Sequence, residues 1–318
     1  MNKKQTCRIF SILLGIGIIG GLILYAGTSE MLDLTKNISW PIVTLATLLY
    51  SSAWILRSSF IKLYTHLPFS KCFKIISLTY MMNAILPAKA GDFHLIYSLK
   101  KRGINLARSV NILIHYRLMD LFSLIIIVVP LLLIYLRGQL PERIINYLLI
   151  VSAIITIPLL IMLDKKGIIN KILKFFEQKI SLKILKNFVG KGRSLYKDYE
   201  ILLKDKKLKA LLLSLSVWLI EGSISYLFSV AIKHPIPIYI IFLSVSIGNL
   251  SKVIPLTPGG LGIYEATVIL LMSLFGIPTS VATLLSILDH ILKTTLGVLI
   301  GALVLIFSKS ENHLKTER

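Results

Sequence analysis

The stretch IPLTPGGLGIYEA, residues Ile254–Ala266, interrupts a long apolar region of the chain. It lies between two apolar runs, Ile236–Val253 and Thr267–Phe275. Prolines remove backbone donors and glycines tolerate non-helical conformations, so the stretch predicts a break between two helices. Glu265 then falls in the first turn of the second helix, where a carboxylate suits the helix dipole. This glutamate either caps the helix or takes part in binding a substrate or a coupling proton.

The composition of the whole chain indicates a membrane protein. The chain has 318 residues, of which only 16% are charged, and its mean hydropathy is +0.78. Apolar runs of about 20 residues, long enough to cross a bilayer, recur along it. Hydrocarbon forces each spanning segment to satisfy its own backbone hydrogen bonds, so helices are expected. We predict an all-α, polytopic integral membrane protein with about seven spanning helices plus re-entrant half-helices, forming a single membrane domain over residues 1–318.

The positions of the basic residues predict the topology of this domain. The formal net charge is +21, but the positive residues cluster in short loops between apolar runs, as the positive-inside rule requires. This pattern favours membrane topology and contact with anionic lipid head groups over binding of nucleic acid. It places both termini in the cytoplasm of a multi-pass protein of the cell membrane. Arg57, Lys62, Lys71 and Lys74 mark a cytoplasmic loop after the second predicted span. The predicted spans are Ile9–Ala26, Trp40–Leu56, Asn111–Leu136, Ile144–Leu163, Ala210–Ile232 and Ser280–Phe307, with residues 238–275 forming either two spans or a hairpin of two half-helices.

A basic insertion separates the two halves of the chain. Residues 164–209 hold fourteen Lys or Arg against five acidic residues. Apolar residues recur there at helical spacing, for example at Ile168, Ile172 and Phe176. Basic amphipathic helices lying on the inner leaflet fit this pattern, and a small soluble helical hairpin is the alternative.

A second break lies in the first half of the chain. The apolar run Ile75–Pro87 is only about 13 residues long, too short to cross the hydrocarbon core. It ends in LPAKAGD, Leu86–Asp92, and basic residues lie on both sides of it. These features predict a re-entrant segment that enters and leaves on the same face. Broken helices at matching positions, entered from opposite faces, indicate an inverted-repeat transporter with its site near the midplane.

Three segments carry a family resemblance. They are PLTPGGLGIYEA (255–266), LPAKAGDFHLIYSLKKRGINLARS (86–109) and YRLMD (116–120). The first resembles the Pro-x-Thr-Pro-Gly-Gly-x-Gly-x-x-Glu signature of the lysylphosphatidylglycerol synthase transmembrane family, a flippase-like family also known as UPF0104 membrane proteins. The resemblance covers roughly residues 9–307 and implies lipid translocation, or an accessory role in glycolipid handling. We expect a stand-alone form without the soluble synthase domain.

The chain departs from that family pattern at four positions. The resemblance leads one to expect Glu where Asp92 stands, a basic residue at Leu95, Glu at Tyr116 and Arg at His290. This chain therefore has fewer of the charged residues that are usual in the family, and the family's substrate cannot be assigned to it from the resemblance alone.

The candidate substrate-binding residues are those in or near the two breaks and the charged residues of the long helices. Half-helix ends at Ala88–Asp92 and Thr257–Glu265 expose N–H groups that suit a phosphate. The full set is Asp92, Arg117, Lys252, Thr257, Gly259, Gly260, Glu265 and Lys293.

Several of these charges have structural alternatives. Arg117 and Asp120 lie three residues apart and can pair with each other, as can Asp289 and Lys293 at i, i+4. Lys252 either extends its side chain toward the membrane surface or meets a phosphate. Glu221 has no partner nearby in sequence, and Lys252 or Lys293 is its expected long-range partner. Two asparagines just ahead of the breaks are expected to satisfy freed backbone groups, Asn83 and Asn249.

The function predicted from these features is lipid translocation. We expect a protein that moves an anionic phospholipid, or a polyprenyl lipid or glycolipid, across the cytoplasmic membrane, with membrane lipids and a lipid-modifying enzyme as partners. Neither a His-Glu-x-x-His zinc motif nor a phosphate-binding P-loop occurs in the sequence. We therefore expect no catalytic activity, no metal and no cofactor. A secondary transporter of a soluble anion and a non-catalytic scaffold for cell-envelope enzymes are the alternatives.

Overall fold

The computed structural model describes residues 3–86, 89–135, 206–252 and 257–316, together with the isolated positions 146 and 175, and its side chains are described from residue 15 to residue 307 within these ranges. Every regular element in these ranges is helical, which confirms the predicted all-α class. The predicted span Ile144–Leu163 and the predicted amphipathic helices of 164–205 lie outside the described residues, as do Pro87–Ala88 and Val253–Leu256.

The described elements fall into two groups. The first group contains α1 (Lys3–Ala26), α2 (Thr28–Lys36), α3 (Trp40–Tyr64), α4 (Phe69–Ile85), α5 (Gly91–Lys101) and α6 (Leu106–Tyr135). The second contains α10 (Lys207–Ala231), α11 (Ile238–Ser251), the 3-10 turn η1 (Pro258–Gly260), α12 (Ile263–Leu274) and α13 (Thr279–Thr316).

The number of spanning helices found is smaller than the seven predicted. Among the described residues, three helices are long and apolar enough to cross a membrane: α6, α10 and residues 279–307 of α13. A fourth span results if Gly15–Ala26 and Thr28–Lys36, bent by 86° at Gly27, are counted together. The predicted span Trp40–Leu56 lies within α3 but is not among them. Serine, tyrosine and arginine side chains lower the mean hydropathy of α3, although the helix has 25 residues.

The break in the first half is present where the sequence predicts it. Helix α4 begins at Phe69, earlier than the apolar run, and has 17 residues. Helix α5 begins at Gly91 and packs against α4. The two form a hairpin, and we call the described residues at its end, Leu86, Lys89 and Ala90, the first tip.

The second half resolves an alternative that the charge pattern leaves open. Helices α11 and α12 have 14 and 12 residues, which correspond to about 21 and 18 Å at 1.5 Å per residue. Neither is long enough to cross about 30 Å of hydrocarbon. The two pack against each other, so they form a hairpin of half-helices rather than two full spans. We call the described residues between them, Lys252 and 257–262, the second tip.

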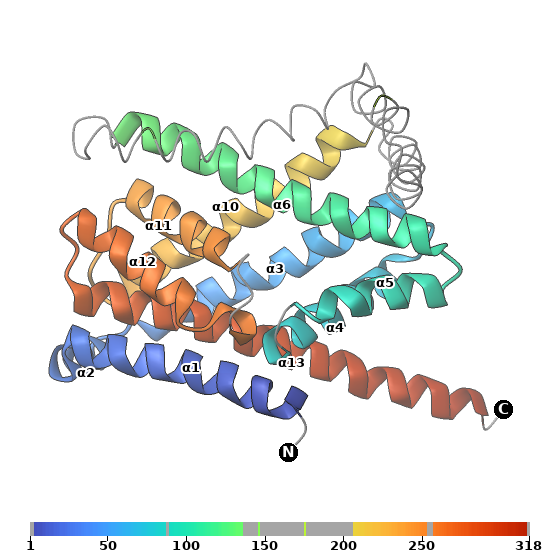
Figure 1. Cartoon of the computed structure of the whole chain (residues 1–318), viewed down its shortest axis with the longest axis horizontal. Coiled ribbons are helices and arrows are strands. Elements are labelled where there is room, and N and C mark those ends of the chain that lie inside the picture. The colour runs from blue at the N-terminus through green and yellow to red at the C-terminus, as the bar shows by residue number, and fades with distance from the viewer. Residues whose placement is uncertain are drawn as a thin grey trace.

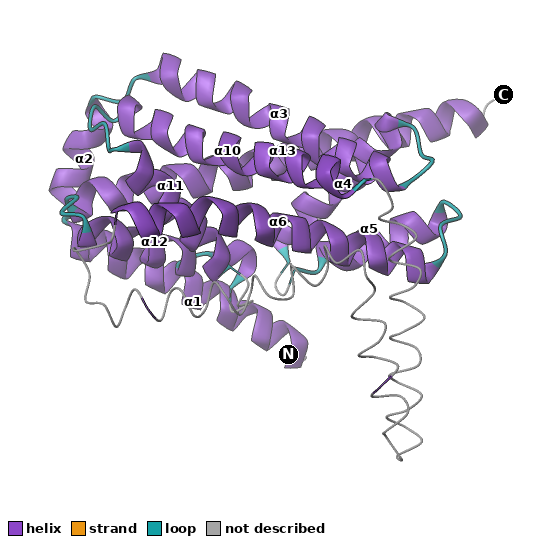
Figure 2. Ribbon diagram, turned by 90° about the horizontal axis from the view of Figure 1, so that it is seen from above, coloured by secondary structure: helices purple, strands orange, loops and turns teal. Residues whose placement is uncertain are grey.

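The two hairpins come from opposite ends of the molecule. The long helices run along the longest axis, with α4 and α5 at the right-hand end and α11 and α12 at the left-hand end (Figure 1). The view from above keeps this arrangement (Figure 2). Each half has the same order: a long helix, two half-helices and another long helix. The halves therefore repeat one plan with opposite orientation, as the paired breaks predict.

Close helix packing holds the two halves together. Helix α3 of the first half packs against α10 of the second half, and α13 of the second half packs against α4 of the first. Gly301 of α13 faces Met81 of α4 so closely that a Cβ added at Gly301 would lie 2.5 Å from the Cβ of Met81. Small residues at helix contacts let backbones approach in this way, and van der Waals packing drives helix association in membranes.

We expect Gly301→Ala to destabilise the protein by about 1–3 kcal/mol, because the added methyl group must push α13 and α4 apart. The measurement is thermal unfolding of the purified chain in detergent. Gly20→Ala is the matched control, since nothing lies within 4 Å of a Cβ at Gly20 of α1. Equal melting temperatures for the two variants would contradict the packing described here.

Candidate functional site

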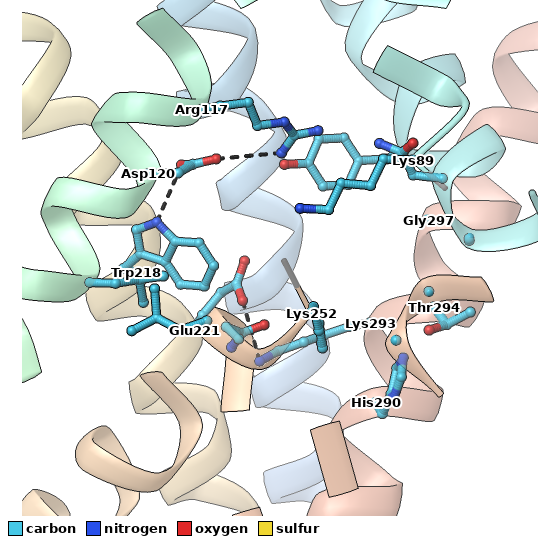
Figure 3. Close-up of a pocket in the computed structure, with 18 of the residues that line it drawn as sticks. Lys89, Arg117, Asp120, Trp218, Glu221, Lys252, His290, Lys293, Thr294 and Gly297 are labelled. Atoms are coloured by element: carbon cyan, nitrogen blue, oxygen red, sulfur yellow. Dashed lines mark hydrogen bonds and ion pairs between the residues drawn. The ribbon is translucent and has the colours of Figure 1, made fainter. Parts of the chain in front are cut away.

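The two tips meet at one cavity in the middle of the helical bundle. Helix α4 contacts η1, and a Cβ placed on Gly259 of the second tip would lie 3.8 Å from the backbone oxygen of Ala84. The cavity has a volume of about 440 Å³. Its lining comes from the first tip, the second tip and the long helices α3, α6, α10 and α13 (Figure 3). All the predicted site residues except Glu265 line it.

The first tip is closed by an asparagine. Asn83, near the end of α4, accepts a hydrogen bond from the backbone N–H of Gly91 at 2.8 Å. Its amide nitrogen donates to Asp92 at 3.2 Å. Asn83 therefore satisfies a backbone group freed by the break, as predicted, and also orients the first acid of α5. Asn249 behaves differently, because it donates to the carbonyl of Val245 within its own helix.

Asp92 holds a two-point ion pair with Arg117 of α6. The Nε of Arg117 donates to Asp92 Oδ2 at 3.0 Å, and its Nη2 donates to Oδ1. Arg117 also lies 3.7 Å from Asp120, the partner that sequence spacing predicts. A bidentate guanidinium–carboxylate pair is among the stronger polar contacts in proteins. It fixes the start of α5 to a long helix.

Glycine backbone geometry shapes the second tip. Gly259 and Gly260 have φ values of 63° and 80°, in the left-handed region that other residues avoid. The hydroxyl of Thr257 donates to the carbonyl of Leu261 at 2.7 Å and closes the turn.

Glu265 caps α12 and binds a histidine. Its Oε2 accepts from the backbone N–H of Gly262 at 2.7 Å, which confirms the predicted capping role. Its Oε1 lies 2.5 Å from Nδ1 of His290 on α13. Glu265 is only 1% exposed, so it reaches the cavity through His290, which lines it. The carboxylate of Glu265 therefore caps the helix that follows the break and connects α12 to α13.

The two tips share one arrangement of charge. In each half, an acid in the first turn of the second half-helix pairs with a base on the next long helix, 25 residues further along the chain. The pairs are Asp92 with Arg117 and Glu265 with His290. At two positions where the family pattern is thinned, Asp92 and His290, the side chains present still make the acid–base contact.

Between the two tips lies an ion-pair network whose Lys293 contacts were predicted but whose arginine was not. Arg57 of α3 is 4% exposed, whereas its position beside Lys62 and Lys71 marks it as part of a cytoplasmic loop in the sequence. That reading of Arg57 is wrong. Its Nη2 lies 2.7 Å from Glu221 of α10, and its Nη1 donates to Tyr116 at 2.8 Å. No local sequence signal separates Arg57 from the basic residues that follow it.

Lys293 completes the network from α13. Its ammonium lies 2.8 Å from Asp289, as its i, i+4 spacing predicts, and 3.5 Å from Glu221. Lys293 is therefore the predicted long-range partner of Glu221, although Arg57 is the closer one. Lys252, the other predicted partner, forms no ion pair with Glu221 in the described structure.

Lys252 ends α11 and has another set of contacts. A Cβ added at Gly260 would lie 2.6 Å from its Cγ, so the glycine makes room for the lysine stem. Its ammonium lies 3.9 Å from the centre of the Tyr264 ring. The Tyr264 hydroxyl in turn donates to Asp289 at 2.6 Å. These contacts place the Lys252 ammonium at the cavity without a carboxylate partner among the described residues.

No metal site is present in the described part of the chain, since no group of three or more His, Cys, Asp or Glu side chains is suitably placed there. The cavity combines backbone turns, paired charges and hydroxyl groups. Such a lining suits the binding of a polar or charged group within apolar surroundings.

Comparisons with known proteins agree with this architecture. A family model described as "Lysylphosphatidylglycerol synthase TM region" matches residues 12–301. The UPF0104 membrane protein MJ1078 of Methanocaldococcus jannaschii is 29% identical over 239 residues, which cover 74% of this chain and 96% of that protein. The UPF0104 membrane protein MJ1595 of the same organism is 34% identical over 97 residues, 30% of this chain and 26% of the relative.

A shorter similarity involves a protein named as an enzyme. Glycosyltransferase AglD of Haloferax volcanii is 33% identical over 95 residues, which cover 28% of this chain and 15% of AglD. The similar segment is thus a small part of that protein.

We expect Arg57→Gln to destabilise the protein by about 3–5 kcal/mol, because it leaves Glu221 buried with weaker compensation. The double variant Arg57→Gln/Glu221→Gln is expected to lose less than the sum of the two single losses. The measurement is unfolding of the purified chain in mixed detergent micelles. Strictly additive losses would show that the two side chains do not interact.

Proposed function

The chain belongs to the lysylphosphatidylglycerol synthase TM region family and is a multi-pass membrane protein, and from this premise we propose that it is a lipid translocase. Its substrate is an anionic phospholipid, or a polyprenyl lipid or glycolipid, that crosses the cell membrane with its head group in the central cavity. The observation that carries the proposal is the meeting of two half-helix hairpins, from opposite ends of the bundle, at one charged cavity.

The cavity provides what a lipid head group needs in order to cross hydrocarbon. A charged group at the bilayer centre costs several kcal/mol without partners. The cavity supplies ammonium and guanidinium groups, and its volume of about 440 Å³ lies within the range of small-molecule sites. Apolar side chains cover the outer faces of the surrounding helices, for example Leu133 and Ile134 of α6 and Leu303 of α13. Acyl chains can therefore stay in the bilayer while the head group moves.

The paired tips offer a mechanism of alternating access. Each hairpin is tied to the long helix that follows it by one acid–base pair, Asp92–Arg117 or Glu265–His290. Each hairpin can therefore move together with that helix, and such motion would change the contact between α4 and η1, where the two hairpins meet. Rocking of one inverted repeat against the other opens a central site to each side in turn.

The same architecture supports a proposed orientation. The right-hand end in Figure 1 carries the α3–α4 and α5–α6 connections and the beginning of α10. Basic residues gather there, namely Lys62, Lys71, Lys74, Lys100, Lys101, Arg102, Lys206, Lys207 and Lys209. By the positive-inside rule this end faces the cytoplasm, together with the C-terminus.

Two other functions remain candidates. A secondary transporter of a soluble anion would use the same cavity and the same inverted halves. A scaffold for glycolipid or cell-envelope enzymes is favoured by the similarity to a segment of a glycosyltransferase. The scaffold does not need the cavity charges, and the soluble-anion transporter does not move lipid.

The test is lipid flipping in proteoliposomes. We expect fluorescent anionic lipids to be flipped by the wild-type chain, and flipping to fall at least about tenfold in Lys252→Ala and Glu265→Gln, because each variant removes a charge contact worth about 1.5–3 kcal/mol. Glu30→Gln is the control, since Glu30 is exposed on α2 and does not line the cavity.

Two results would refute the proposal. One is the absence of flipping for anionic, zwitterionic and polyprenyl-phosphate lipids alike by folded, inserted protein. The other is unaltered flipping in both Lys252→Ala and Glu265→Gln. Saturable uptake of a soluble anion without flipping would favour the second candidate, and co-purification of an enzyme with tolerance of Glu265→Gln would favour the third.

A further inference from the structure

The charges around the cavity are not all neutralised. Within the described residues, the cavity is lined by five Lys or Arg side chains, namely Arg57, Lys89, Arg117, Lys252 and Lys293. Arg57, Arg117 and Lys293 each have a carboxylate within 4 Å. Across the described ranges, no carboxylate lies within that distance of Lys89 or Lys252. These two lysines come from different tips, one from each half of the molecule.

Lys89 is held in a backbone conformation that is unusual for a lysine. Its φ is 51°, in the left-handed region that costs about 1–2 kcal/mol for a residue with a Cβ. Among the described non-glycine residues, only Lys233 also has a positive φ, and Lys233 lies in an exposed turn away from this cavity. Strained backbone is concentrated at functional sites. The strain at Lys89 places a long basic side chain at the first tip, where Figure 3 shows it extending into the cavity.

Lys252 is positioned from the other side. Gly260 leaves room for its stem, and the Tyr264 ring faces its ammonium group at 3.9 Å. A cation held over an aromatic ring keeps its charge without the neutralising effect of a carboxylate. In Figure 3, Lys89 and Lys252 lie on different sides of the cavity, with Arg117 beside the first and Lys293 beside the second.

We propose that Lys89 and Lys252 form a two-point clamp for the phosphate of the substrate, with one ammonium group supplied by each half of the molecule. This inference rests on the proposed function and adds Lys89 as a binding residue. An ammonium group is a compact point charge that binds phosphate well. Arg117 and Lys293 do not belong to the clamp, because each already forms an ion pair with a carboxylate. They hold the tips in place around the clamp.

The clamp has a consequence for head-group selection. Five basic side chains line the cavity and repel one another, and an anionic phosphate bound to the two without carboxylate partners relieves this repulsion. A zwitterionic head group carries its own positive charge close to the phosphate and relieves it less. The cavity therefore prefers an anionic head group to a zwitterionic one that has the same phosphodiester.

The experiment measures binding to the purified full-length chain in nonionic detergent by calorimetry. The probes are dioctanoyl phosphatidylglycerol, dioctanoyl phosphatidylcholine and glycerol 3-phosphate, so that lipid and soluble sources of phosphate are distinguished. The variants are Lys89→Gln and Lys252→Gln. Lys233→Gln is the matched control, because Lys233 shares the positive φ of Lys89 but lies outside the cavity. Melting temperatures confirm that each variant is folded.

We expect the wild type to bind phosphatidylglycerol at least about tenfold more tightly than phosphatidylcholine, and each cavity variant to lose about tenfold in affinity for phosphatidylglycerol. Lys233→Gln is expected to match the wild type. If only one of the two cavity lysines matters, the two-point clamp is wrong.

The remaining outcomes separate this inference from the proposed function. Wild-type affinity for phosphatidylglycerol in both lysine variants, together with flipping by the wild-type chain that is lost in Glu265→Gln, overturns the clamp and leaves the translocase standing. Binding of glycerol 3-phosphate alone, dependent on both lysines, supports the phosphate clamp but overturns a lipid as its substrate. An absence of binding by every probe overturns both.

Discussion

Backbone hydrogen bonding in hydrocarbon is the constraint on which the structure depends. A helix that breaks within a membrane frees N–H and C=O groups that lipid cannot satisfy, so irregular backbone is tolerated only inside protein or beside a polar cavity. In the described residues, the two hairpins contain such breaks, and both lie inside the bundle, against each other and against one cavity. Asn83 at the first tip and Glu265 at the second supply the missing hydrogen bonds. The surrounding long helices then enclose the tips.

Charge pairing follows from the same constraint. The fully buried charges at the centre of the bundle, such as Arg57, Glu221 and Asp289, can stay ionised only with partners close by. The network therefore crosses from one half to the other, with Arg57 of α3 bound to Glu221 of α10 and Lys293 of α13 close to the same carboxylate. It joins the halves and gives the cavity its polar wall. Because so many of the charges are matched, the two lysines without carboxylate partners stand out as the groups available to a ligand.

Part of the site was predictable because its residues belong to local sequence patterns. Proline and glycine clustered within a few residues of an apolar run signal a break, so both tips were located correctly, whereas the single Pro130 lies inside α6. Contacts three or four residues apart, such as Asp289 with Lys293, follow from helix geometry. Arg57 was misread because charge counting cannot separate a buried arginine near a helix end from the basic loop beside it. Lys89 was passed over because its backbone strain is visible only in three dimensions.

The sequence by itself determined that this is an all-helical membrane protein with one break in each half, because hydropathy, helix-breaking residues and loop charge are local properties of the chain. It did not decide whether residues 238–275 cross the membrane or turn back, since a run of apolar residues does not show this. Only the tertiary structure decided that the two tips meet, that α11 and α12 are half-helices, and which distant charges pair. Those contacts join residues up to 164 positions apart, and their partners are fixed by how the two inverted halves pack, which no local pattern records.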